Sequence, residues 1–183
     1  GIDSGFTSVM FDGSKLSLKE NIKITSKIAK ITKNYKVSLE GEVGLVGYHK
    51  GINSEGTTLF EAKKFSNESG VDAMAISVGN THLQTSKIAK IDYNKIKQIE
   101  KVSDIPLVLH GSSGISYNLR KKIARNTKVA KFNIGTELRM IAGESLKDNI
   151  KKNKKTFDRL QLIKPTVKNI TKATIKVIKN IGP

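Results

Sequence analysis

The 183-residue chain contains no cysteine and no tryptophan, only 3 prolines, and 5% aromatic residues. Without cysteine, disulfide scaffolds, cysteine-ligated zinc and thiol nucleophiles are excluded. No apolar run approaches the ~18 residues that a membrane span requires. Residues 1–11 lack the basic-then-apolar pattern of a signal peptide. We therefore expect a soluble cytoplasmic protein with no membrane partner.

Acidic residues are scarce as well, with 16 Asp and Glu against 33 Lys and Arg, which gives a formal net charge of +17. A sequence pI near 10.0 is typical of nucleic-acid binding. However, 29 of the basic residues are Lys and only 4 are Arg, and they are scattered along the chain. Proteins that recognise nucleic acid specifically depend on bidentate arginine contacts and on aromatic side chains that stack on bases. We interpret the charge as compositional bias. A polyanion-binding fragment and a degenerate gene product stay open as non-enzymatic alternatives.

Apolar periodicity predicts alternating strands and helices, which is the pattern of an α/β protein with a parallel sheet. The predicted strands are residues 6–11, 37–43, 73–78, 107–109 and 129–134. The predicted helices are residues 18–33, 59–69, 92–102, one capped by Ser116, 137–151, and a last one starting at Pro165. Ser17 and Glu20 have the spacing of a capping box. The length suits one domain but is less than the roughly 250 residues of a complete (β/α)8 barrel.

Polar residues follow several of the predicted strands directly, at the end where parallel βα proteins gather their functional groups. They are Asp12, Glu42, His82, His110 and Asn133. Imidazoles and carboxylates are typical ligands of a catalytic divalent metal, so His82 and His110 predict a metal site to which Asp12 and Glu42 could add oxygens. The alternatives are unrelated polar residues at strand ends, and carboxylates that form hydrogen bonds or cap helices.

Two glycine-containing loops open predicted helices, at Gly111–Gly114 and at Gly135–Thr136. Amide groups at a helix N-terminus bind phosphate, and loops after the last two strands of a barrel are a frequent phosphate site. The loop beside His110 therefore predicts phosphate binding. An ordinary βα turn is the alternative.

Five segments together resemble the class II fructose-bisphosphate aldolases, including their tagatose-bisphosphate branch. They are GFTSVMFDGS (5–14), VSLEGEVG (37–44), VDAMAISVGNTH (71–82), IPLVLHGSSGI (105–115) and VAKFNIGTELR (129–139). The resemblance implies a TIM (β/α)8 barrel and a zinc-dependent aldol reaction in which the metal acts as a Lewis acid, without a Schiff-base lysine. It also implies cleavage of fructose 1,6-bisphosphate to triose phosphates in glycolysis, and a homodimer or larger oligomer.

The resemblance assigns roles position by position. His82 and His110 match two catalytic zinc ligands. Asp12 and Glu42 match carboxylates of a second cation position, and Glu42 ligates the catalytic metal in some branches. The implied substrate-binding residues are Leu83, Gly111, Ser112, Ser113, Asn133, Ile134, Gly135, Thr136 and Arg139. Arg139 matches an arginine for the far phosphate, which favours the fructose substrate over tagatose bisphosphate.

The sequence also departs from the family pattern. The family's opening strands, with an Asp-His pair that supplies the proton donor and the third zinc ligand, are absent from the 183 residues, so no catalytic residue is assigned. Leu83 replaces a glycine. The loop Gly47–Lys50, whose His49 we expect to be exposed, lacks the usual acidic residues. Five strands cannot close an eight-stranded barrel and leave two unpaired edges. We therefore expect residues 1–183 to form one partial barrel domain that, alone, binds zinc weakly and lacks aldolase activity.

Overall fold

The computed structural model describes residues 1–44, 47–48, 56–82, 89 and 91–182, with the backbone alone at 47–48 and 81–82. His49 and Leu83 lie outside the described residues, so what the sequence predicts for them stays a prediction.

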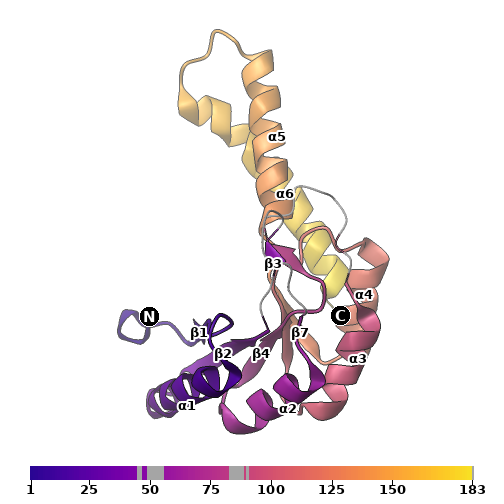
Figure 1. Cartoon of the computed structure of the whole chain (residues 1–183). Helices are drawn as coiled ribbons and strands as arrows, with labels where there is room; N and C mark the ends of the chain where they lie inside the picture. Colours follow the sequence, from indigo (N-terminus) through magenta and orange to yellow (C-terminus); the bar gives the residue numbers. More distant parts are fainter. Residues whose placement is uncertain (45–46, 49–55, 83–88, 90, 183) are drawn as a thin grey trace.

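A five-stranded parallel sheet forms the centre of the protein (Figure 1). Its strands are β1 (Ser8–Phe11), β2 (Ser38–Val43), β4 (Ala73–Ile76), β6 (Leu107–Leu109) and β7 (Val129–Phe132), in that spatial order. Each strand pairs in parallel with the previous one in the sheet, so the sheet grows in one direction, as the wall of a barrel does. The predicted α/β class and all five predicted strands are confirmed. β1 and β7 are the two edges.

The helices follow the strands as the periodicity predicts. They are α1 (Leu18–Asn34), α2 (Leu59–Glu68), α3 (Tyr93–Val102), α4 (Tyr117–Asn126), α5 (Thr136–Lys152) and α6 (Arg159–Ile181), with a short 3-10 helix at Ile2–Ser4. The predicted capping box is present, since Ser17 accepts from the Glu20 amide and the Glu20 carboxylate accepts from Ser17. No helix in the described part of the chain combines the length and apolarity of a membrane span.

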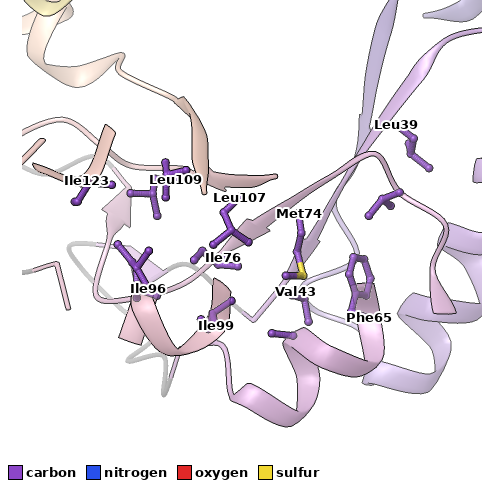
Figure 2. Packing of buried hydrophobic residues seen from close by; sticks show 14 of the residues in the cluster. Leu39, Val43, Phe65, Met74, Ile76, Ile96, Ile99, Leu107, Leu109 and Ile123 are labelled. Atoms are coloured by element: carbon purple, nitrogen blue, oxygen red, sulfur yellow. The ribbon is translucent and has the colours of Figure 1, made fainter. Parts of the chain in front are cut away.

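The main hydrophobic core lies between one face of the sheet and the helices that cover it (Figure 2). Alternate strand residues fill this layer together with helix side chains: Leu39, Val43, Met74, Ile76, Leu107 and Leu109 from the sheet, and Phe65, Ile96, Ile99 and Ile123 from the helices. Gly41 belongs to the same face, because a Cβ there would lie 2.8 Å from Phe65 Cζ and 2.9 Å from Val71 Cγ1. The absent side chain lets α2 approach β2 closely.

A second, two-stranded sheet was not predicted. β3 (Gly47–Tyr48) pairs in parallel with β5 (Thr81–His82), and Tyr48 lies opposite His82 in the register. The sequence pattern placed residues 44–56 in a loop and His82 just beyond a strand. Two residues are too few to show a strand period, so this pairing left no signal in the sequence.

The prediction that Pro165 starts the last helix is wrong, because α6 begins at Arg159 and Pro165 lies inside it. Proline has no amide hydrogen to donate to the carbonyl four residues earlier, which usually ends a helix. Here Asn149 of α5 donates from Nδ2 to the Gln161 and Leu162 carbonyls at 3.2 and 2.7 Å. The freed carbonyl therefore has a donor. α5 and α6 form a hairpin that extends away from the sheet (Figure 1).

Candidate metal and phosphate site

The face of the sheet opposite the main core carries the charged side chains. Glu40 and Glu42 lie two residues apart on β2, so they share a face, and their register partners on β4 are Ala73 and Ala75. The two alanines are too short to fill the space over β4. The carboxylates can therefore reach across β4 toward His110, which directly follows β6.

His110 lies between the two carboxylates. Its Nε2 is 2.8 Å from Glu40 Oε1, and its Nδ1 is 3.0 Å from Glu42 Oε2. All three side chains are at most 6% exposed. Such a cluster is buried, polar and satisfied at both ring nitrogens, which is the environment that fixes an imidazole in one orientation.

Lys131 of β7 completes this cluster. Its Nζ is 2.7 Å from Glu40 Oε2, so each oxygen of the Glu40 carboxylate has its own partner. Glu40 thus connects β2, the end of β6 and β7 through side chains alone. Removing either cation from a buried carboxylate would leave an uncompensated charge, which costs far more than a surface pair contributes.

Charge pairing shifts the protonation of this cluster. Burial by itself would lower the pKa of His110, but hydrogen bonds to Glu40 and Glu42 and their negative charges outweigh burial and raise the pKa to about 9. Burial would raise the pKa of Glu40, but hydrogen bonds from His110 and Lys131 outweigh it and lower the pKa. In this structure, therefore, His110 is an imidazolium that donates to two carboxylates at neutral pH.

The backbone at His110 is held by Asn80, which is 2% exposed. Asn80 Nδ2 donates to the His110 carbonyl at 2.8 Å and to the Ile76 carbonyl at 3.1 Å, while Oδ1 accepts from the Val78 amide at 2.6 Å. The ends of β4 and β6 are thereby joined. This fixes the position from which the His110 side chain extends.

The two predicted phosphate loops lie side by side. The Ser112 amide donates to the Asn133 carbonyl at 3.1 Å, and the Glu137 amide donates to Ser113 Oγ at 3.1 Å. Ser112 is fully buried, and its hydroxyl donates to the Leu109 carbonyl at 2.7 Å. Gly111 has φ 59, a left-handed conformation that glycine adopts without strain. The two loops therefore adjoin at the ends of β6 and β7.

The remaining predicted phosphate residues surround the start of α5. Ile134, Gly135 and Thr136 are half-buried, and Gly135 is the N-cap of the helix. Arg139 is exposed and folds back over the loop, with its NH2 group donating to Thr136 Oγ1 at 2.9 Å. A positive side chain therefore lies against the backbone that the resemblance assigns to phosphate.

Two predicted metal ligands are placed differently from His110. Asp12 is exposed at the end of β1, where it accepts hydrogen bonds from the Ser14 amide and hydroxyl at 3.0 and 2.6 Å. Within the described residues it takes no part in the cluster around His110. His82 lies in β5, and its side chain is not described.

Among the described residues, no group of three or more His, Asp or Glu side chains is arranged to hold a metal ion. The described pair His110 and Glu42 nevertheless offers one imidazole nitrogen and one carboxylate, the donor chemistry that zinc accepts. These two residues therefore fit part of a zinc site.

A cavity of about 300 Å³ lies beside the phosphate loops, between the starts of α4 and α5. Ser113 and Thr136 contribute to its lining, as does the buried Arg120, whose guanidinium pairs with Glu137 at 2.6 Å. None of its lining residues belongs to the His110 cluster. The cavity is thus distinct from the His110 cluster.

Sequence reasoning missed three residues of this site, namely Glu40, Lys131 and Asn80. Glu40 had a signal, because it precedes Glu42 by two residues in a strand and so had to share its face. Lys131 could not be distinguished from the many other lysines. Asn80 lay within the quoted segment 71–82, but its role depends on the neighbouring strand end.

Comparison with known proteins agrees with this fold. A family profile described as fructose-bisphosphate aldolase class-II matches residues 1–183. The chain belongs to the class II fructose-bisphosphate aldolase family. Its parallel sheet and covering helices are the corresponding part of a TIM-barrel aldolase.

Relatives in sequence differ in the substrates that their names give. The 6-phospho-5-dehydro-2-deoxy-D-gluconate aldolase of Shouchella clausii is 32% identical over 99% of this chain and 62% of that protein. The fructose-bisphosphate aldolase of Ureaplasma parvum is 40% identical over 82% of this chain and 53% of that protein. The chain thus spans about three-fifths of the length of these relatives.

Among solved structures, the YdjI aldolase of Escherichia coli K12 has a TM-score of 0.77 and 26% identity, and the match covers 98% of this chain and 61% of that one. A putative fructose-1,6-bisphosphate aldolase from Coccidioides immitis has a TM-score of 0.79 at 23% identity, and this likeness concerns the fold alone. Both matches place the chain within one part of an aldolase barrel.

Proposed function

We propose that this chain is the part of a class II aldolase that binds metal and phosphate, and that the protein cleaves fructose 1,6-bisphosphate reversibly to dihydroxyacetone phosphate and glyceraldehyde 3-phosphate. The observation that carries the proposal is His110, held by Glu40 and Glu42 at a strand end beside two adjoining helix-opening loops. Family membership favours this enzyme over a polyanion-binding fragment.

In the proposed site, His110, Glu42 and His82 hold a zinc ion, with Asp12 available to a second cation. When bound, zinc supplies Lewis-acid polarisation of the substrate carbonyl. The ring of His110 is presented in a fixed orientation because Glu40 and the Asn80 contact hold its side chain and its backbone.

The proposed phosphate contacts come from the two loops. The loops at Gly111–Ser113 and at residues 133–136 hold the phosphate of the dihydroxyacetone phosphate half, and the second loop lies at the favourable end of the α5 dipole. The Ser112 and Asn133 amides donate to the Asn133 and Leu109 carbonyls, so these two residues shape the loops and other groups of the loops contact the phosphate. Arg139 binds the far phosphate through its guanidinium group, which can donate two parallel hydrogen bonds. No proton donor is proposed among these 183 residues.

A second substrate is favoured by one observation, the 32% identity to a 6-phospho-5-dehydro-2-deoxy-D-gluconate aldolase. That name, like fructose bisphosphate and tagatose bisphosphate, describes a ketone beside a phosphorylated carbon. The proposed metal and phosphate sites could bind all three substrates. The substrates differ at the end that lies far from the shared ketone and phosphate. Arg139 would pair with a second phosphate, so we place fructose 1,6-bisphosphate first.

The test measures triose phosphate release by the intact protein from each of the three substrates. We expect the highest kcat/KM with fructose 1,6-bisphosphate, loss of activity with EDTA, and recovery with Zn²⁺. Borohydride treatment with substrate should not inactivate, since no Schiff base forms. His110→Ala should abolish turnover, whereas the α3 variant Lys97→Met should not change it. Activity that survives EDTA, or that is unaffected by His110→Ala, would refute the proposal.

A further inference from the structure

The two carboxylates that flank His110 are not equivalent. Glu40 has both oxygens engaged, with Oε1 at 2.8 Å from His110 Nε2 and Oε2 at 2.7 Å from Lys131 Nζ. Glu42 contacts His110 Nδ1 through Oε2 at 3.0 Å. Glu40 is therefore a fixed acceptor between two donors, whereas no lysine or arginine among the described residues forms an ion pair with Glu42.

An imidazole that binds a metal uses one nitrogen for the metal and donates a hydrogen bond from the other. The acceptor of that second bond sets the tautomer and the ring orientation. In this chain, the acceptor already held in place is Glu40, and it faces Nε2. A metal would then bind Nδ1 in place of the proton that Nδ1 now donates to Glu42 Oε2.

We propose that Glu40 and Lys131 are a positioning pair for the metal site, which keeps the proton of His110 on Nε2 and leaves Nδ1 for zinc. This inference rests on the proposed function, because it requires that His110 ligates the metal. Neither residue touches substrate or metal in this scheme. Glu40 acts through His110, and Lys131 acts through Glu40.

The position of Lys131 explains why a lysine suits this role. Lys131 is on the edge strand β7 and its side chain is 53% exposed, whereas the Glu40 side chain is 5% exposed. The long apolar stem spans the face of the sheet, and the ammonium reaches the buried carboxylate from the solvent side. Its ammonium offsets the carboxylate charge of Glu40, whose other oxygen lies 2.8 Å from His110 Nε2.

The experiment measures Zn²⁺ affinity of the intact protein by titration calorimetry and the His110 ring nitrogens by long-range ¹H–¹⁵N correlation. In the zinc-loaded wild type, we expect a protonated Nε2 that exchanges slowly with water and a zinc-bound Nδ1. Glu40→Gln and Lys131→Met should each weaken Zn²⁺ binding about ten- to a hundredfold. Both should also speed exchange of the Nε2 proton.

Two further variants separate positioning from general stability. Lys131→Arg keeps a cation at Glu40 and should retain most of the wild-type affinity. Lys97→Met removes a half-buried lysine of α3 that pairs with Glu100 and donates to the Asn126 carbonyl, with the same change in charge, and should leave Zn²⁺ affinity unchanged. A purely structural role for Glu40 or Lys131 would lower the melting temperature without changing the exchange of the Nε2 proton.

The outcomes distinguish the two proposals. Zinc bound through Nε2, or wild-type affinity in both Glu40→Gln and Lys131→Met, would overturn the positioning pair and leave the proposed metal site standing. Absence of Zn²⁺ binding by the wild-type protein would overturn both.

Discussion

Asn80 and His110 are joined by a hydrogen bond between the Asn80 side-chain amide and the His110 carbonyl, 2.8 Å long. The same amide group donates to the Ile76 carbonyl, and its oxygen accepts from the Val78 amide. One buried side chain therefore satisfies three backbone groups where β4 and β6 end. The sharp turn that follows β4 and the position of His110 depend on each other.

Replacing Asn80 by Ala should lower the free energy of unfolding by about 2–4 kcal/mol, because buried backbone groups would lose their partners. Asn80→Asp should be no better, since a carboxylate cannot donate to two carbonyls. Urea denaturation followed by circular dichroism measures the loss. Asn169→Ala, which removes an exposed bond to Ser145, is the matched control and should change stability by less than about 0.5 kcal/mol. If Asn80→Ala also changed the free energy of unfolding by less than about 0.5 kcal/mol, the three hydrogen bonds of Asn80 would not stabilise the fold as predicted.

The stability of the metal-free protein should fall as pH rises from about 6.5 to 9. The pKa of His110 is about 9 in the folded protein and near 6.5 when unfolded. A group with a raised folded pKa contributes its full stability below the unfolded pKa and loses it as pH rises through the folded pKa. The expected loss is on the order of 3 kcal/mol.

Denaturation midpoints at several pH values, with EDTA present, check this dependence. His110→Asn removes the titrating ring, so its stability should be flatter across the same window. Glu40 and Glu42 contact the ring, and Lys131 contacts Glu40. Equal slopes for wild type and His110→Asn would show that another group is responsible.

The fold was predictable from local signals that the structure retains. Ser17 and Glu20 marked the start of α1 because a capping box is a contact within four residues. The apolar run 107–109 predicted β6, because a strand signal of this kind also lies within a few consecutive residues. The prediction that Pro165 starts α6 was wrong because Asn149, on another helix, supplies the hydrogen bond that the proline cannot donate. Such long-range compensation cannot be read from a local pattern.

The candidate site was predictable only in part. His110 and Glu42 stood out as polar residues at strand ends, and they prove to be in contact. Glu40 and Lys131 meet across two intervening strands, a separation of roughly 14 Å on a flat sheet. Their pairing depends on the short Ala75 side chain and the course of the sheet, neither of which the spacing of charges reveals.

Two glycines should respond in opposite ways to alanine. Gly41→Ala places a Cβ 2.8 Å from Phe65 Cζ, and Phe65 is fully buried, so stability should fall by about 1–3 kcal/mol. Gly143 lies in α5 with nothing within 4 Å of an added Cβ. Gly143→Ala should therefore stabilise the protein by about 0.5–1 kcal/mol through helix propensity. Urea denaturation of both variants measures whether the free energy of unfolding rises or falls. Phe65→Leu should partly rescue Gly41→Ala, and a neutral Gly41→Ala would mean that α2 packs less closely than described.

The hairpin of α5 and α6 provides a test of how Pro165 is tolerated. Asn149→Ala removes the donor to the Gln161 and Leu162 carbonyls, and should cost about 1–2 kcal/mol because the proline cannot replace that bond. In Pro165→Ala, the new amide hydrogen can donate to Gln161 in the usual helical way, so Asn149→Ala should then cost less than half as much. A double-mutant cycle from urea denaturation measures this coupling. Strict additivity of the two substitutions would mean that Asn149 does not compensate for Pro165.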